Sequence, residues 1–149
     1  MTLSDSPVFT RCETTVAFNW GLGGPGNGVN NDLFSARWTG IHSFNAGNYT
    51  FTATADDGIR AYIDNAQIID GWQDQPATTY NYIQDVTGGN HEIRVEYYEN
   101  EGLASVSFGF EELPTPSVVY SAQYFNNKDL TGDPILERED DGINFEWGG

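Results

Sequence analysis

The chain is poor in cysteine and in basic residues. Its single cysteine, Cys12, excludes an intramolecular disulfide framework and any zinc site built on cysteines. Six basic residues, with Lys128 as the one lysine, stand against 22 acidic residues, so the formal net charge is −16 at pH 7. Nucleic acid and anionic membranes both require a positive face, and this charge argues against them as partners. A polyacid of this kind can still bind metal cations.

Long apolar runs are missing as well. No run approaches the roughly 20 residues of a membrane-spanning helix, so we expect no membrane insertion. The first five residues contain neither a basic nor an apolar stretch, and no secretory signal is visible there. Aromatic residues, in contrast, are frequent (nine Phe, eight Tyr and four Trp), unlike in a disordered acidic tail. A chain of 149 residues suits one domain that buries about 70% of its unfolded surface.

Polar and apolar residues alternate along most of the chain. This period of two is clearest in residues 48–55, 59–64, 92–97 and 105–110, each of which we expect to form a strand with one buried face. Gly, Asn and Asp separate these stretches as turn signals, and no stretch combines a helical period with a cap. The pattern predicts an all-β fold, an antiparallel β-sandwich of the jelly-roll-like kind. Residues 21–32, rich in Gly and Asn, are expected to form a long surface loop.

A repeat with an offset of 127 residues divides the chain. The identical pairs are Leu3 and Leu130, Pro7 and Pro134, Arg11 and Arg138, Phe18 and Phe145, Trp20 and Trp147, and Gly21 and Gly148. Pro114 and Pro116 indicate an extended linker where one module should end. We therefore expect a β-sandwich module at 1–113 that lacks its opening strand, a Pro-rich linker at 114–117, and the opening segment of a second copy at 118–149.

The C-terminal segment offers aromatic residues for strand assembly, namely Tyr120, Tyr124, Phe125, Phe145 and Trp147. A sandwich with an unfilled strand position exposes a sheet edge and apolar surface, which favours a partner strand. Three arrangements are open. The segment folds back on its own module, it complements a neighbouring subunit in a homo-polymer, or the chain is a piece of a tandem array.

The acidic triplet Asp56-Asp57-Gly58 lies between two expected strands. These residues are typical of a tight turn, but they also fit a metal site. Successive side chains of an extended chain point to opposite faces, so both carboxylates reach one ion only if the backbone departs from that geometry, for example by a cis peptide. Calcium is the natural ion, because it takes roughly six to eight oxygen ligands. A second loop must complete the site, and residues 99–102 are the best candidate.

Several motifs resemble the PA-fourteen domain, the protective-antigen-type β-sandwich. They lie at residues 34–40 (FSARWTG), 46–51 (AGNYTF), 56–64 (DDGIRAYID), 69–72 (IDGW) and 89–99 (GNHEIRVEYYE). Residues 120–148 resemble the opening of the same domain, so the resemblance covers nearly the whole chain. In the lectin members of this family, two adjacent aspartates joined by a cis peptide hold calcium, and the calcium chelates sugar hydroxyls.

The resemblance implies a set of site residues for this chain. Asp56 and Asp57 match the aspartate pair and would hold both calcium and sugar. The loop 99–103 matches the second calcium loop, where we expect the Asn100 side chain, Glu99 as its alternate, and backbone carbonyls up to Leu103. The loop 71–75 matches one that lines the sugar, with Trp72 and Gln73 as contacts; Trp72 either stacks on a sugar ring or packs locally.

The sequence therefore predicts a calcium-dependent carbohydrate-binding lectin or adhesin module of a surface protein. Its expected location is extracellular or at the cell surface, and its expected partners are glycans or polysaccharide. The alternative is a structural subunit of an extracellular filament or tandem-repeat stalk, assembled by strand exchange through the C-terminal segment. We do not expect an enzyme, because no nucleophile, histidine base or clear pair of acids rises above background, and in this family the domain accompanies catalytic domains without catalysing.

Overall fold

The structure is a computed structural model that describes residues 6–114 and 119–144. The chain divides into two compact units, Met1–Leu113 (unit 1) and Pro114–Gly149 (unit 2). All regular elements of the described residues are β-strands. Within the same residues, a search for helices long and apolar enough to cross a membrane finds none.

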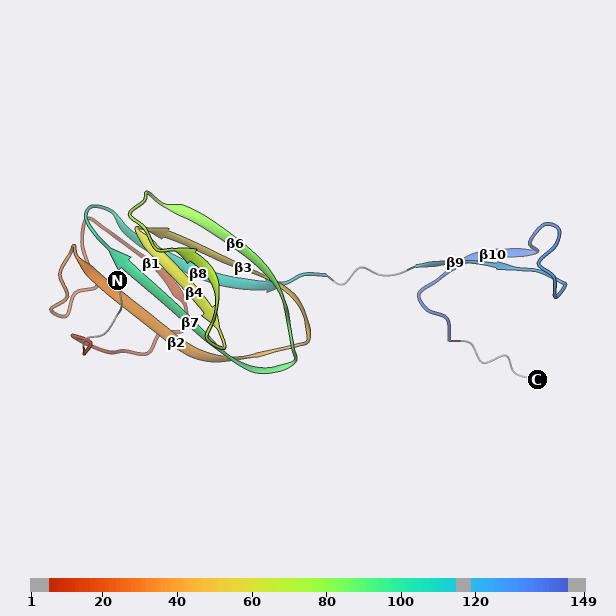
Figure 1. The fold of residues 1–149 in the computed structure, drawn as a ribbon, viewed down its shortest axis with the longest axis horizontal. Coiled ribbons are helices and arrows are strands. Elements are labelled where there is room, and N and C mark those ends of the chain that lie inside the picture. The colour runs from red at the N-terminus through yellow and green to blue at the C-terminus, as the bar shows by residue number, and fades with distance from the viewer. Residues whose placement is uncertain (1–5, 115–118, 145–149) are drawn as a thin grey trace. The chain divides into compact units, whose positions relative to one another are not determined.

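Unit 1 is a sandwich of two four-stranded antiparallel sheets (Figure 1). One sheet has the strand order β1-β8-β3-β6 and the other has the order β2-β7-β4-β5. The strands are β1 (Val16–Gly21), β2 (Phe34–Phe44), β3 (Gly47–Asp56), β4 (Gly58–Ile63), β5 (Ala66–Gly71), β6 (Thr78–Val86), β7 (Gly89–Glu99) and β8 (Ala104–Glu112). The predicted all-β antiparallel sandwich is confirmed.

The core lies between the two sheets, on the apolar face of each strand. Every second residue of β3 from Tyr49 to Ala55 is buried, and the polar residues between them point outward. Phe51, Ile59 and Tyr97 are fully buried and come from three different strands. Burial of a large apolar side chain stabilises the folded state by about 1.5–3 kcal/mol. The period of two therefore favours a fold in which one face of each strand is buried between two sheets.

The strands predicted from alternation are present. Residues 48–55, 92–97 and 105–110 fall within the longer strands β3, β7 and β8, whereas 59–64 matches β4 except that Asp64 lies beyond its end. β7 continues beyond residue 97 to Glu99, because the alternation of buried positions continues from Tyr97 to Glu99. Between β1 and β2 the chain forms no strand, in agreement with the expected loop.

Unit 2 contains one antiparallel hairpin, β9 (Tyr120–Tyr124) paired with β10 (Leu136–Asp140). Arg138 forms an ion pair with Asp140 at 2.8 Å and donates a hydrogen bond to the Tyr124 hydroxyl at 2.8 Å. Of the aromatic residues expected to serve assembly, Tyr120 and Tyr124 lie at the two ends of β9 and Phe125 follows it, whereas Phe145 and Trp147 lie outside the described residues. That this unit opens a second copy of unit 1 stays a prediction.

Candidate metal centre

Three carboxylates meet at one end of unit 1. Asp56 ends β3, Asp57 connects β3 to β4, and Glu99 ends β7. Each offers a ligand oxygen, and these oxygens all lie within 4.8 Å of one another. The peptide bond between Asp56 and Asp57 is cis. Residues far apart in the sequence thus form one acidic cluster, because β4 and β7 are neighbours in the sheet.

Glu99 is the deepest member of the cluster, with 1% of its surface exposed. Its Oε1 atom is buried and has no hydrogen-bond partner. Its Oε2 atom lies 3.0 Å from the Tyr97 hydroxyl, which also lies 2.6 Å from the Asp56 carbonyl oxygen. Burial raises the pKa of the Glu99 carboxyl and the charges of Asp57 and Asp56 raise it further, against the hydrogen bond from Tyr97. A buried, unpartnered carboxylate oxygen is costly unless a cation or proton satisfies it.

Asp57 is held in place by backbone amides from two loops. Its Oδ1 accepts a hydrogen bond from the Gln75 N–H at 3.0 Å, and its Oδ2 accepts one from the Asn100 N–H at 2.8 Å. A carboxylate oxygen has two lone pairs, so both atoms keep an acceptor position for a ligand. Burial raises the pKa of the neighbouring Asp56 carboxyl, and the charge of Asp57 raises it further. The site is therefore fixed in position but strained by like charges.

The second loop contributes differently from the expectation. The side-chain amide of Asn100 donates to Asp74 at 3.2 Å, and the Tyr98 hydroxyl donates to the same carboxylate at 2.7 Å. Asn100 thus serves the aspartate pair through its backbone N–H, while Glu99 brings a carboxylate into the cluster. Leu103, whose carbonyl is an expected ligand, lies directly before β8 and is 57% exposed, and its role stays a prediction.

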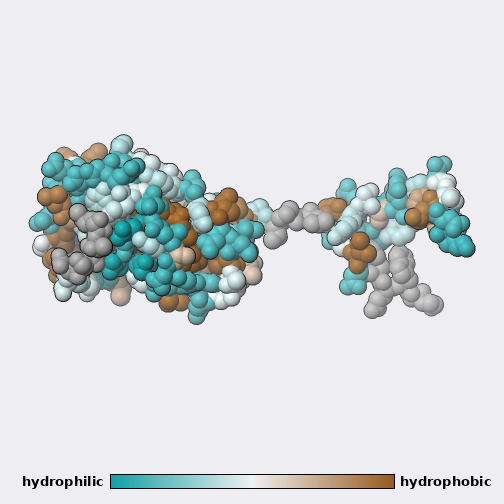
Figure 2. Space-filling view, viewed as in Figure 1, coloured by the Kyte–Doolittle hydropathy of each residue, from teal (hydrophilic) through white to brown (hydrophobic). Residues whose placement is uncertain are grey.

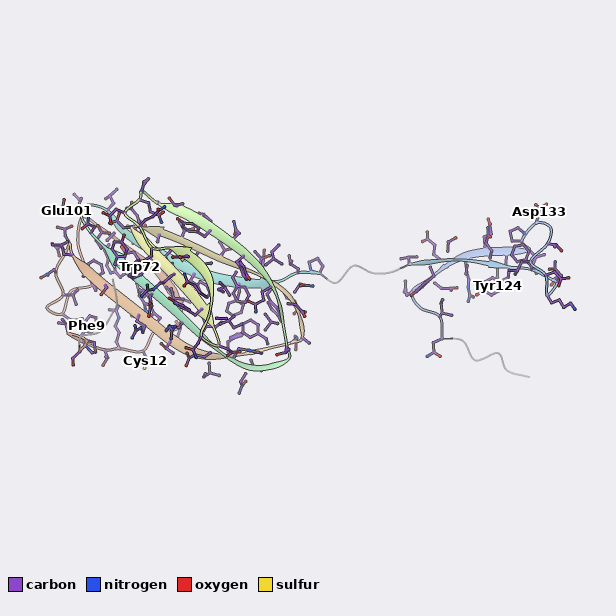
Figure 3. The ribbon with its side chains drawn as sticks, viewed as in Figure 1. Phe9, Cys12, Trp72, Glu101, Tyr124 and Asp133 are labelled. Atoms are coloured by element: carbon purple, nitrogen blue, oxygen red, sulfur yellow. The ribbon has the colours of Figure 1, made fainter. Side chains whose placement is uncertain are left out.

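Trp72 and Gln73, expected to touch sugar, make local contacts. The Trp72 ring, labelled in Figure 3, lies in unit 1. It packs edge-on against Tyr98, with centroids 4.7 Å apart, and the Arg60 guanidinium lies 4.1 Å above it. The Gln73 side chain donates to Gln75 at 3.2 Å. Trp72 thus makes local contacts, and its role toward a sugar stays a prediction. The face of unit 1 that Figure 2 shows carries hydrophilic areas with hydrophobic patches between them.

Two carboxylates near the site were missed by the sequence analysis. Asp74 binds Tyr98 and Asn100, and Asp32 accepts a hydrogen bond from the Gly102 N–H at 3.2 Å. Both residues lie in loops, whose sequences have no hydrophobic alternation. The positions at which these loops contact the sandwich therefore cannot be predicted from such a pattern. Glu99, by contrast, is the alternate ligand that the sequence analysis named, and it shares the inward parity of Tyr97.

The donor set of the cluster suits a hard cation. All candidate ligand atoms are oxygens, which calcium prefers, and neither sulfur nor imidazole is present in the cluster. Among the described residues of unit 1, the ion pairs use Glu13, Asp64 and Glu96 as their acids, and none uses a cluster carboxylate. The unpartnered Glu99 oxygen is the observation that makes the residues fit a bound ion.

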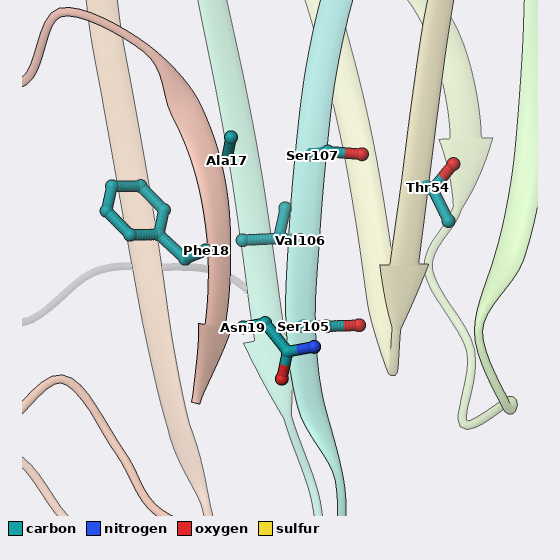
Figure 4. Close-up of a pocket in the computed structure, with 7 residues that line it drawn as sticks. All are labelled: Ala17, Phe18, Asn19, Thr54, Ser105, Val106 and Ser107. Carbon is teal, nitrogen blue, oxygen red and sulfur yellow. The ribbon is translucent and has the colours of Figure 1, made fainter. Parts of the chain in front are cut away.

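Two other surface pockets lack a comparable group of carboxylates. A shallow one on the outer face of β1, β8 and β3 presents side-chain oxygens and amides only, from Asn19, Thr54, Ser105 and Ser107 (Figure 4). A larger groove lies between the N-terminal segment 6–13, the loop before β2, and β2 itself. Neither gathers acids as the cluster does, so the cluster is the candidate site.

Comparison with known proteins identifies relatives that cover nearly the whole chain. It is 31% identical to the anti-sigma-I factor RsgI3 of Acetivibrio thermocellus, over 93% of this chain and 25% of that protein. A solved anti-sigma factor domain-containing protein has a TM-score of 0.66 at 30% identity, over 93% of this chain and 56% of the other. A second, from Clostridium clariflavum, has a TM-score of 0.65 at 26% identity, over 89% and 53%. The chain spans about a quarter of the curated relative and about half of each solved chain.

These relatives correct the predicted function and partners. The prediction of a carbohydrate-binding adhesion module with glycan partners is wrong, because the relatives across nearly the whole chain are regulatory proteins. The alternative of a filament subunit that forms a homo-polymer by strand exchange is wrong for the same reason. The physical cause is general, since a sandwich specifies its sheets and core but not the protein it is joined to.

The family itself is settled by unit 1. The model of the PA14 domain matches residues 1–113, which are the residues of that unit. The resemblance seen in the sequence motifs is thereby confirmed. The chain belongs to the PA14 domain family.

Proposed function

We propose that this chain is a calcium-binding control module of a protein that acts as an anti-sigma factor. The similarity to RsgI3 across 93% of the chain supports the regulatory part of the proposal. The observation that carries the calcium part is the buried Glu99 Oε1, which has no hydrogen-bond partner and belongs to a carboxylate next to Asp56 and Asp57. Because the chain spans only a quarter of that relative, other parts of the protein would bind the sigma factor or another regulatory protein.

In this proposal Asp56, Asp57 and Glu99 hold the cation. Calcium bound there would supply the positive charge that offsets the mutual repulsion of three carboxylates. Asp57 is already oriented by the amides of Gln75 and Asn100, so it brings two loops to the same site. When calcium is bound, the loops that contain Gln75 and Asn100 would be held in one arrangement around Asp57. The rest of the protein would respond to that arrangement.

The expected extracellular location belongs to the same proposal. Extracellular calcium modules have dissociation constants of about 10⁻⁴–10⁻³ M, which matches sites assembled from a few carboxylates on loops. The proposal also treats the chain as a binding module without catalytic activity of its own. The acidic surface, with a net charge of −16, suits a setting rich in divalent cations.

Calorimetric titration of the whole chain with calcium tests the binding part. We expect one site in the wild type and at least tenfold weaker binding in Asp57→Asn. Asp85→Asn is the matched control, because it removes the same charge from an exposed position paired with Asn48 at the opposite end of β3. No binding to the wild type, or equal binding to Asp57→Asn, would overturn the proposal.

The regulatory part is tested in the full protein that contains this chain. We expect transcription dependent on its sigma factor to change with calcium in the wild type and in Asp85→Asn, and to lose that dependence in Asp57→Asn. Identical calcium responses of all three proteins would show that the cluster has no control role. Direct capture of the sigma factor by the 149-residue chain would show that it is the binding part and not the control part.

A further inference from the structure

The loop between β1 and β2 ends beside the acidic cluster. Its residue Asp32 accepts the Gly102 N–H at 3.2 Å, and the next residue, Leu33, donates its own N–H to the Asn100 carbonyl oxygen at 3.0 Å. Both contacts are made to the loop that follows Glu99. This third loop is therefore joined by two hydrogen bonds to the segment that orients Asp57.

Asp32 also acts on the cluster through its charge. The pKa of the Glu99 carboxyl is raised first by burial, and Asp32 is among the carboxylates whose charges raise it further, together with Asp57 and Asp56. Asp32 lies outside the three-residue set whose oxygens are within 4.8 Å of one another. Asp32 is thus close enough for its charge to act on Glu99, although it is not one of the three clustered carboxylates.

Three carboxylates do not complete the coordination of calcium. The ion takes roughly six to eight oxygens, and the cluster offers one ligand oxygen from each of three carboxylates. The buried and unpartnered Oε1 of Glu99 independently points to a cation at this place. Such a site has coordination positions left for further oxygens, and a carboxylate from a neighbouring loop can fill one.

The loop that bears Asp32 is held together by contacts of its own. Gly24 packs so closely on the backbone of Asn30 that an added Cβ would overlap it, and Val29 donates its N–H to the Gly26 carbonyl at 3.0 Å. At its end, Leu33 has a φ of 57°, an uncommon backbone conformation for leucine, and 70% of its surface is exposed. Leu33 thus connects this loop to the loop after Glu99, through its N–H, and to β2, which begins at the next residue.

We propose that Asp32 is a fourth carboxylate of the cation site, and that the loop 22–33 closes on the site when a divalent cation binds. This inference rests on the proposed calcium site and names its regulation. Phe34, which follows the loop and begins β2, packs against Tyr97 with ring centroids 5.8 Å apart, so the loop has a second contact with the residues around Glu99. The same loop lines the groove beside the N-terminal segment, so its closure reshapes that groove.

The test uses the whole chain, calcium titration and hydrogen exchange of individual amides. In Asp32→Asn the side chain keeps an oxygen that can accept the Gly102 N–H, so the fold is expected to persist. Calcium affinity should fall about tenfold, because one negative charge near the ion is lost. Saturating calcium should slow exchange of amides in the loop 22–33 of the wild type and of Asp85→Asn, but not of Asp32→Asn.

The outcomes separate this inference from the proposed function. If the wild type binds calcium and Asp57→Asn does not, while Asp32→Asn matches the wild type in affinity and loop protection, Asp32 is no part of the site and the inference is overturned. If the wild type itself binds no calcium, the proposed function fails and the inference fails with it. Weakened binding of Asp32→Asn together with lost loop protection supports it.

Discussion

The backbone N–H of Asn100 donates a 2.8 Å hydrogen bond to Oδ2 of Asp57. This bond joins the end of β7 to the junction of β3 and β4, and the Gln75 N–H makes a similar bond to Oδ1. Asp57 is 6% exposed, so water cannot easily replace either bond. The carboxylate therefore has a structural task even before any cation binds.

Replacement of Asp57 by alanine tests that structural task. Asp57→Ala leaves two backbone donors without an acceptor, which should lower the free energy of unfolding by about 1–3 kcal/mol for each buried donor left unpaired. Asp57→Asn keeps an acceptor oxygen and should lose less. Urea unfolding in the presence of EDTA measures both variants without a cation effect. Equal stability of Asp57→Ala and the wild type would mean that these bonds contribute little.

Calcium should raise the thermal stability of the chain. A ligand that binds only the folded state stabilises it by about 2.7 kcal/mol at a concentration a hundred times its Kd. For a domain of the size of unit 1, this corresponds to an increase in Tm of about 10 °C. Thermal unfolding followed by circular dichroism, with EDTA and with calcium, measures the shift. Asp57→Asn should show little of it, and a full shift in that variant would place the ion elsewhere.

Replacement of Glu99 by glutamine should have opposite effects with and without calcium. In EDTA, Glu99→Gln removes a buried charge next to Asp56 and Asp57 and should be as stable as the wild type, or more stable by about 1–3 kcal/mol. In calcium the wild type gains stability and the variant does not. The two denaturation curves should therefore exchange order when calcium is added. Parallel responses to calcium would remove Glu99 from the set of ligands.

The sequence predicts the sandwich well because alternation and burial are local. Tyr49, Phe51, Ala53 and Ala55 lie on one face of a strand whatever the rest of the chain does, and the aspartate pair is contiguous. The preference for the Asn100 side chain, with Glu99 as its alternate, came instead from the resemblance to the PA-fourteen domain. The structure instead places the Glu99 carboxylate beside the pair, as the inward parity of β7 would have indicated.

The loop contacts could not be predicted in the same way. Asp32 and Asp74 reach the site only because loops from both sheets end at the same side of the sandwich. No spacing in the sequence encodes where the loops 22–33 and 72–77 return to the sandwich. For the same reason the sequence around Trp72 does not predict its contacts. In the structure its ring packs against Tyr98.

The pair of His91 and Asp64 should make stability depend on pH. His91 Nδ1 lies 2.6 Å from Asp64 Oδ2, and its Nε2 lies 2.9 Å from the Thr87 carbonyl oxygen. The hydrogen bond to Asp64 raises the pKa of His91, with the Thr87 carbonyl adding to it, and the bond from His91 lowers the pKa of Asp64. Two acceptors around one ring favour the doubly protonated imidazole.

The sign of the pH effect follows from these two shifts. The contribution of His91 is fully present below its unfolded pKa of about 6.5 and is lost as the pH rises through the folded value. The contribution of Asp64 is present above about pH 3.9 and is lost as the pH falls. Urea unfolding should show the wild type losing stability from pH 6 to 8, and Asp64→Asn losing less. The variant keeps an oxygen for the Glu92 N–H; curves that stay parallel from pH 6 to 8 would rule out the pair as the cause.

Gly58, directly after the aspartate pair, should not tolerate a side chain. An added Cβ would overlap the ring of Tyr98, whose hydroxyl donates to Asp74 at 2.7 Å and whose ring packs against Trp72. Gly58→Ala must displace that ring, and such overpacking costs about 1–3 kcal/mol. It should also weaken calcium binding, because Tyr98 and Asp74 brace the loop that follows Glu99.

Gly109 in β8 provides the matched control for this substitution. A Cβ there would meet nothing within 4 Å, so Gly109→Ala should be neutral or stabilise the chain by up to about 1 kcal/mol through the unfolded state. Urea unfolding of both variants in EDTA, followed by calcium titration, measures the difference. If Gly58→Ala matches Gly109→Ala in both experiments, the Tyr98 ring moves freely and does not support the site. If only Gly58→Ala loses stability and calcium affinity together, the glycine is required because the ring of Tyr98 must cover it.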